Sequence, residues 1–431
     1  MTTPLALEQA PPLSVPLRFF LSGPPLGAAA GVLVAVRWDV VTESRWALES
    51  LAAVHLVTVG FMLQVMAGAL LQFLPVAAGA NVWRPRVTGA VAHIGFLGGG
   101  LLLVGGFLGL GGWCFRGAAF TFGVATLFYV AVVGGGLLRS SAIGPTLPAL
   151  KLAVLGLLVT VALGVTLLTA LGWSARVPVL EVLHAHVAWG VIGWSATLVV
   201  GVAYLVVPMF QLTPPYPTRL AFALPPGLFG AALAWTAGVL LAVRWLAWAG
   251  TALGALALVG FAVKTLQLQA RRRRGVKDST FYAWRVGMAA LVLAVVAAVA
   301  VRALPEGAAR IRLEYVVGVA LFAGVFPAVI SGMLYKIVPF LVWLHLQRVM
   351  TGAPTMQKVI PAAGPRWQLR VLGAALACLS LAAAWPVLAV AGGALFAAAC
   401  LLLEWHVVQA ARLYARLAAA AAQRPEAGAR P

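Results

Sequence analysis

The sequence predicts an all-α polytopic membrane protein, with about 12 transmembrane helices in a pseudo-threefold arrangement of three four-helix repeats. Hydrophobic residues make up 63% of the chain and charged residues only 9%, whereas soluble proteins contain about 25% charged residues. The mean hydropathy is +1.01. Long apolar segments follow one another along the chain, and one glycine and proline pattern recurs in every fourth segment. A surface built from these residues has to face lipid rather than water.

The individual helices follow from the apolar segments. A helix that crosses a bilayer needs about 20 mainly apolar residues. Segments of this kind lie near residues 18–37, 52–77, 87–109, 117–138, 148–172, 181–211, 222–243, 245–268, 283–303, 313–341, 370–388 and 390–412. We therefore expect residues 1–431 to form a single transmembrane domain, with repeats near 18–138, 148–268 and 283–412 and a cytoplasmic tail at 413–431.

Basic residues predict the orientation in the membrane. In a soluble protein, the net charge of +20 would suggest a nucleic-acid partner, but in a membrane protein it reflects the enrichment of Lys and Arg in cytoplasmic loops. The run Arg271–Arg274 falls on the same side of the predicted topology as both termini, and most acidic residues fall on the other side. We expect a bacterial inner-membrane protein with both termini in the cytoplasm and without a nucleic-acid partner.

An internal repeat links the second, sixth and tenth segments. Counting back from a proline, one glycine lies seven residues earlier and another lies fifteen residues earlier. The three sets are Gly60, Gly68 and Pro75, then Gly193, Gly201 and Pro208, then Gly324, Gly332 and Pro339. Glycines in membrane helices allow neighbouring helices to pack closely. The repeat predicts that these three segments line a common central axis.

The histidines are the strongest candidates for chemistry. His55 lies near the outer end of the second segment, and His184 and His186 lie at the outer end of the sixth. Ionisable groups inside a membrane are costly and tend to be functional, and neutral imidazole is a common ligand of haem iron and of divalent metals. We predict that these histidines bind a cofactor or metal, with carboxylates such as Glu181 and Glu314 orienting their ring N–H groups. The alternative is that they are interfacial and meet water.

The remaining histidines are weaker candidates. His345 is expected at the cytoplasmic interface, and His93 is expected to have a structural role. Glu404 and His406 are close in sequence but point to nearly opposite sides of a helix, which disfavours a proton relay between them.

Two segments resemble a known family. The second reads HLVTVGFMLQVMAGALLQFLPV and the sixth reads HAHVAWGVIGWSATLVVGVAYLVVPMF. The second has a His followed by a Gly and then a Pro, and the sixth has His-x-His followed by Gly-Trp, Gly, Tyr and Val-Pro. Both orders resemble helices of the main subunit of the haem–copper oxidase superfamily, especially its NO reductase and C-type oxidase branches. The resemblance implies that His55 is an axial ligand of a low-spin haem, and that His184 and His186 serve different haems on opposite sides of one helix. It also places five further residues in the haem environment: Gly68, Gly193, Trp194, Gly201 and Tyr204.

The sequence departs from that family at the copper site. In the family the His-x-His helix is the tenth, whereas here it is the sixth, and this chain has no His-Pro-Glu segment and no adjacent His-His pair. The seventh segment, near 222–243, contains no histidine and supplies none of the imidazoles that hold copper in an oxidase. We therefore expect no oxygen reduction by the haem–copper mechanism.

The leading interpretation is a haem b-binding membrane protein, with one or two haems and a redox, electron-transfer or NO-related role. A periplasmic or membrane electron donor is the expected partner. His186 is the predicted haem ligand across from His55, because it shares a helix face with Gly193 and Tyr204, where glycines leave room for a porphyrin. His184 would contact a second haem, a metal or a carboxylate.

Two alternatives remain open. The first is a transporter with a polar site near the outer ends of the second, sixth and tenth segments. The second is a copper or zinc handling protein that uses His55, His184 and His186 as metal ligands, since imidazole without cysteine suits these divalent metals.

Overall fold

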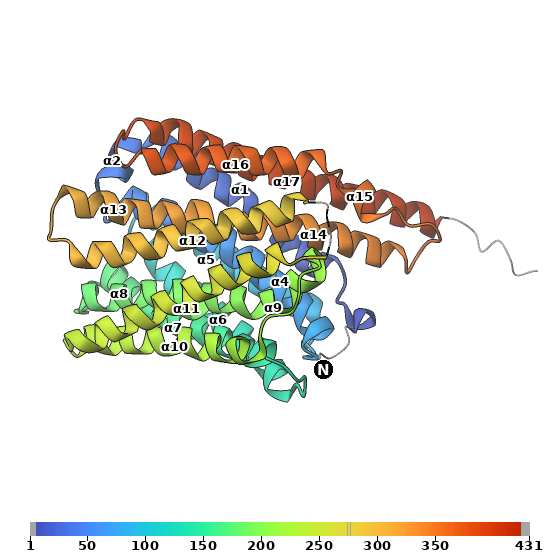
Figure 1. Ribbon diagram of the computed structural model, residues 1–431, viewed down its shortest axis with the longest axis horizontal. Helices are drawn as coiled ribbons and strands as arrows, with labels where there is room; N and C mark the ends of the chain where they lie inside the picture. Colours follow the sequence, from blue (N-terminus) through green and yellow to red (C-terminus); the bar gives the residue numbers. More distant parts are fainter. Residues whose placement is uncertain (1–5, 274, 276, 424–431) are drawn as a thin grey trace, which may run out of the picture.

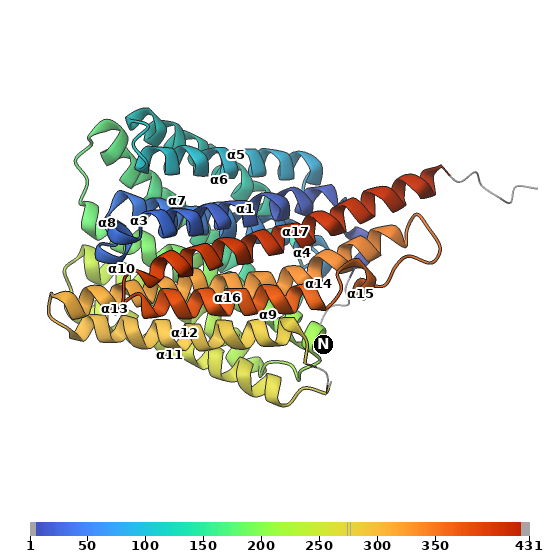
Figure 2. The ribbon, with the colours of Figure 1, turned by 90° about the horizontal axis from the view of Figure 1, so that it is seen from above.

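The computed structural model describes residues 6–273, 275 and 277–423. Over these residues the chain is helical and contains no β-strand. The long helices run side by side in one bundle (Figures 1 and 2). Eleven helices of the described part are long and apolar enough to cross a membrane, so the chain is a multi-pass α-helical membrane protein.

Eight of these spans are single helices, and three are divided into α and π parts. The single helices are α1 (Ser14–Val36), α5 (Pro85–Phe107), α6 (Gly112–Arg139), α7 (Thr146–Trp173), α10 (Thr218–Leu240), α11 (Arg244–Ala270), α12 (Ser279–Ala303) and α17 (Leu388–Ala422). Three short helices lie between or before the spans: η1 (Leu7–Gln9), α2 (Trp38–Glu43) and α15 (Met356–Val359).

The divided spans are the second, sixth and tenth, those that carry the sequence repeat. The second consists of α3 (Leu48–His55), η2 (Leu56–Leu63) and α4 (Gln64–Ala77). The sixth consists of α8 (Val179–Ala188), η3 (Trp189–Ala196) and α9 (Thr197–Gln211). The tenth consists of α13 (Ala308–Val319), η4 (Ala320–Val325) and α14 (Phe326–Leu346). In each, the π segment begins nineteen residues before the repeated proline. Nothing in the residue pattern predicted these π segments, which are often found at functional sites.

The divided spans are also the most buried ones. Of an apolar 18-residue window in each span, 72%, 61% and 72% is buried in the second, sixth and tenth, compared with 28–50% in the other spans. A single cavity is lined by residues of α4, α9 and α14. These three spans therefore lie inside the bundle and share one central space.

The repeated glycines pack against the preceding helix of the bundle. A Cβ atom on Gly68 would lie 2.5 Å from Phe19 of α1, and one on Gly201 would lie 2.6 Å from Ala149 of α7. A Cβ atom on Gly332 would lie 2.7 Å from Ala283 of α12. Close helix packing, the expected role of glycine in membranes, is thus observed at all three positions.

One predicted helix lies outside the eleven spans. It is α16 (Ala363–Leu381), which has 19 residues and packs against α17 (Figure 2). We predicted it at 370–388, but the structure begins it earlier, because Pro365 is tolerated in a first helical turn. It also ends earlier, since Pro386 disfavours helix at the residue before it and the apolar residues 382–387 form the turn.

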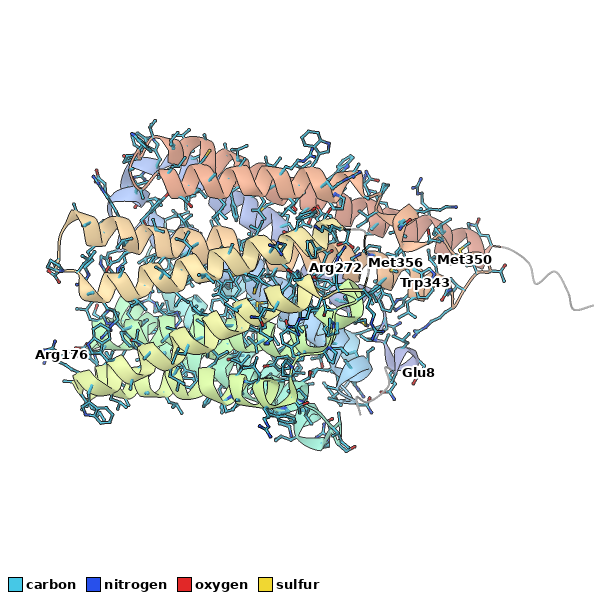
Figure 3. All side chains as sticks on the ribbon, in the orientation of Figure 1. Glu8, Arg176, Arg272, Trp343, Met350 and Met356 are labelled. Atoms are coloured by element: carbon cyan, nitrogen blue, oxygen red, sulfur yellow. The ribbon has the colours of Figure 1, made fainter. Side chains whose placement is uncertain are left out.

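The two ends of the bundle can be told apart by the residues that lie there. Glu8, Arg272 and Met350 lie at one end, and Arg176 lies at the other (Figure 3). The described part of α17 also leaves the bundle at the first of these ends (Figure 1). We call this the terminal end and the other the opposite end. Helix α17 has 35 residues, about 52 Å of helix, so it extends beyond a hydrocarbon core of about 30 Å. The expected tail at 413–431 is therefore helical as far as Ala422, and residues 424–431 lie outside the described residues.

Candidate functional site

The structure brings His55 and His186 together in the half of the bundle nearer the opposite end. His55 is the last residue of α3, directly before a π segment, and His186 lies in α8, shortly before another. Their ring centroids are 6.5 Å apart and the two ring planes differ by 19°. Both side chains are half-buried. The pair therefore joins two of the inner spans through side chains that can bind a metal.

The hydrogen bonds of the pair fix which ring nitrogen carries the proton. Nδ1 of His55 lies 2.7 Å from the carbonyl oxygen of Leu51, and Nδ1 of His186 lies 3.0 Å from that of Thr160. A carbonyl oxygen only accepts, so Nδ1 donates in both rings. In the neutral imidazole, Nε2 then keeps its lone pair. This is the tautomer in which a metal-binding histidine is usually held by its surroundings.

Helices α5 and α7 complete the surroundings of the pair. The Phe107 ring of α5 lies 5.3 Å from the His55 ring, centroid to centroid. Gly164 of α7 faces the other ring, and a Cβ atom there would lie 3.0 Å from Cε1 of His186. The His186 ring therefore occupies space that the absence of a side chain at Gly164 leaves beside α7.

His184 is not part of this pair. Among the described residues, its ring makes no hydrogen bond and stacks on no other ring. Its electrostatic environment consists of Arg45, Glu181, Arg302 and Glu314. The two histidines of the His-x-His segment thus have different neighbours, as predicted.

The carboxylates do not orient the histidine rings, contrary to our expectation. Glu314 accepts from Arg45 at 3.1 Å and from Arg310 at 3.2 Å, while backbone carbonyls accept the ring N–H groups of the pair. Burial lowers the pKa of Arg45 and the nearby Glu314 carboxylate opposes that shift. Since arginine stays charged in proteins, this ion pair ties the segment before α3 to α13.

The glycine face of the sixth span is filled by protein, and this corrects a second expectation. A Cβ atom on Gly156 of α7 would overlap the carbonyl of Gly193 and lie 2.9 Å from the backbone nitrogen of Trp194. Helix α7 therefore occupies the space that we expected a porphyrin to use.

Three further residues of the predicted haem environment lie far from the pair. Gly68 is thirteen residues from His55, and Gly201 and Tyr204 are fifteen and eighteen residues from His186, which corresponds to roughly 20–27 Å along the helices. Tyr204 packs edge-on against Tyr216 instead, with ring centroids 5.3 Å apart.

The other histidines are held by the protein itself. Nε2 of His93 lies 3.1 Å from the Ser22 hydroxyl, and Nδ1 of His406 lies 3.1 Å from the Tyr335 hydroxyl. His345 is only 7% exposed, not interfacial as expected, and its ring nitrogens contact the carbonyls of Leu341 and Pro11 at 2.9 and 3.0 Å.

A polar cavity lies at the opposite end, beside the pairing of Arg45 with Glu314. It measures about 170 Å³ and is bordered by residues 41–46 and by Ile311, Glu314 and Tyr315. The buried hydroxyl of Tyr315 has no hydrogen-bond partner among the described residues. The cavity touches the tenth span and the segment before the second, but its lining includes no residue of the sixth.

Several residues that shape the pair were missed by the sequence analysis. The bond from His55 to Leu51 spans four residues of one helix, a spacing that the sequence could have suggested. Thr160, Gly164 and Phe107 belong to other helices, and their proximity depends on how α5 and α7 pack. No sequence signal marks that packing.

No protein-family model matches the chain, and no curated protein matches it.

Proposed function

We propose that this chain is a haem b-binding integral membrane protein related to haem–copper oxidase main subunits, with His55 and His186 as the axial ligands of one haem. The observation that carries the proposal is the pair itself, two nearly parallel imidazoles that both present Nε2. The earlier resemblance of these two helices to haem-binding helices points to the same cofactor.

The spacing of the pair fits a shared metal atom. Metal–imidazole bonds of about 2.0–2.1 Å on both sides, plus the two rings, place the ring centres roughly 6 Å apart. The observed separation is 6.5 Å. The spacing of the two rings is therefore compatible with one metal atom between them.

The number of protein ligands favours haem over copper or zinc. Among the described residues, no group of three or more His, Cys, Asp or Glu side chains could hold a metal. Zinc sites use three or four protein ligands, whereas a porphyrin supplies four nitrogens and needs only two axial histidines from the protein. His184 stands apart and supplies no third ligand to the pair.

Two axial histidines favour an electron-transfer role. A haem held by both His55 and His186 would carry one electron at a time and would have no open position for a gas. The chain's own contribution would be to hold both rings by their Nδ1 atoms, with Phe107 and α7 packed beside them. We infer one haem for this pair and a periplasmic or membrane electron donor as the partner.

The transporter alternative is less well supported. The shared cavity of the three inner spans is walled almost wholly by apolar side chains, which would not stabilise a polar substrate. The polar cavity at the opposite end borders the salt bridge between Arg45 and Glu314, and no residue of the sixth span lines it.

We also propose the complete membrane topology. Counting α16 as a span gives twelve, in three repeats of four with a pseudo-threefold arrangement of the second, sixth and tenth. The matching π segments, glycine contacts and burial of these spans support the repeat. The arginine-rich terminal end would face the cytoplasm of a bacterial inner membrane.

Absorption spectroscopy tests the proposal. The purified chain should show a sharp Soret band, the spectrum of a low-spin haem b on reduction, and a haem to protein ratio near one by pyridine haemochrome assay. A colourless protein after expression with ample haem supply would contradict it. Carbon monoxide should leave the reduced spectrum unchanged, because neither axial position is open.

A further inference from the structure

The central cavity is a second feature that needs an explanation, separate from the histidine pair. Its volume is about 160 Å³, and its walls come from α4, α9 and α14, with Leu7 and Trp284. In each of the three spans the wall runs from ten residues before the repeated proline to two residues after it. Twelve residues of helix correspond to about 18 Å, so the space is long and narrow.

The wall is apolar along this whole length. Gln72 is the one amide among the lining residues, and the indole nitrogen of Trp284 is already bonded to the sulfur of Met333 at 3.4 Å. Apolar cavities of this size stay dry and take apolar guests. A polar substrate or a row of water molecules would lose its hydrogen bonds here.

At the terminal end, the N-terminal segment of the chain borders the cavity. The aliphatic side chain of Leu7 forms part of the cavity wall. Its segment is held by three hydrogen bonds: Ala6 N–H to the Val76 carbonyl, Arg348 to the Leu7 carbonyl, and His345 to the Pro11 carbonyl. A branched hydrocarbon side chain therefore already lies against the cavity wall at this end.

We propose that this cavity is a binding tunnel for a single hydrocarbon chain, and that the segment 7–11 gates its entrance. The length, the narrow volume and the apolar wall match an extended chain rather than a compact molecule. The hydrocarbon chain could belong to a lipid acyl group or to the isoprenoid tail of a lipid-soluble redox carrier. Both present the same apolar surface to the cavity wall. This inference does not depend on haem.

Photo-crosslinking in lipid nanodiscs tests the tunnel. Two probes, a palmitoyl-length fatty acid and a linear prenol, each carry a diazirine at the far end of the chain, and labelled residues are mapped by mass spectrometry. We expect labels on Met66 and Met333 in the wild-type protein. Preference for one probe identifies the source of the chain. Labels confined to lipid-facing helices such as α11 would overturn the proposal.

Variants that fill the tunnel sharpen the test. Val202→Phe, or Ala69→Phe if the first does not fold, should lower labelling of the tunnel about tenfold or more, since overpacking a filled site costs about 1–3 kcal/mol. The matched control is Val263→Phe on α11, at a side chain that is 43% exposed, and it should label as the wild type does. Equal tunnel labelling in the filled and control variants would sink the proposal.

The gating role of the segment 7–11 is tested separately by the rate of labelling. Leu7→Gly should speed labelling of Met66 severalfold, because the side chain at the proposed entrance is removed. An unchanged rate would show that chains enter elsewhere. The haem content of the same samples is measured in parallel, so failure of the tunnel and failure of the haem proposal are distinguishable.

Discussion

The carbonyl oxygens of Leu51 and Thr160 only accept hydrogen bonds, so each decides which nitrogen of a nearby histidine ring is protonated. The consequence is a pair of imidazoles that present the same free atom, Nε2. The sequence indicated which histidines were candidates, because polar groups are rare in these spans. The sequence could not show that Glu314 forms salt bridges with Arg45 and Arg310, since that pairing depends on the fold.

Gly164 provides a prediction at this scale. Gly164→Val would place a side chain against the His186 ring, where a Cβ atom alone lies 3.0 Å from Cε1 and 3.4 Å from Nδ1. Displacing the ring from the Thr160 carbonyl should cost about 1–3 kcal/mol, and haem occupancy should fall severalfold. Haem per polypeptide measures this. Gly260→Val on α11, with no neighbour within 4 Å, is the control and should retain full occupancy.

Helices were predictable from the sequence, whereas their internal geometry was not. Apolar run length located most span ends to within about five residues. The exceptions are the turn 382–387, which is itself apolar, and α17, which ends at Ala422 rather than near the predicted 412. The π segments escaped prediction because they leave no mark on hydropathy. The glycine pattern predicted a repeat, and three of its glycines, Gly68, Gly201 and Gly332, contact α1, α7 and α12.

The repeated glycines should therefore control stability rather than haem binding. Gly201→Val would press against Ala149, where a Cβ atom would already lie 2.6 Å away, and should destabilise the protein by about 1–3 kcal/mol. Thermal unfolding in detergent, followed by thiol-reactive dye, measures the loss. Gly98→Val on α5, with no neighbour within 4 Å, should melt close to the wild type. An unchanged Tm for Gly201→Val would mean that α7 and α9 are not closely packed.

At the scale of the whole molecule, the distribution of basic residues and the number of spans predict how the chain is oriented in the membrane. Arg272 and Glu8 lie at the terminal end and Arg176 at the other (Figure 3), and the proposed twelve spans bring both chain ends to one side. This topology can be predicted from the sequence because the bilayer imposes a fixed span length and a bias in basic residues. The central cavity could not be foreseen, since it depends on how three helices meet.

Cysteine labelling tests the topology. Cys114, Cys378 and Cys400 are replaced, and single cysteines are introduced by Ala308→Cys and Thr351→Cys at exposed positions of the two ends. A membrane-impermeant maleimide added to intact cells should label position 308 and spare position 351. Both become reactive after the cells are broken. Labelling of both positions in intact cells would contradict the proposed orientation.

The central claim is that His55 and His186 share one haem, and replacing each ligand tests it most directly. Reduced-minus-oxidised spectra of the purified His55→Ala and His186→Ala variants should lack the low-spin haem signal. His184→Ala should keep that signal at wild-type intensity, because its ring lies outside the pair. Full retention of the low-spin haem in both of the first two variants, or its complete loss in His184→Ala, would contradict the assignment of the ligands.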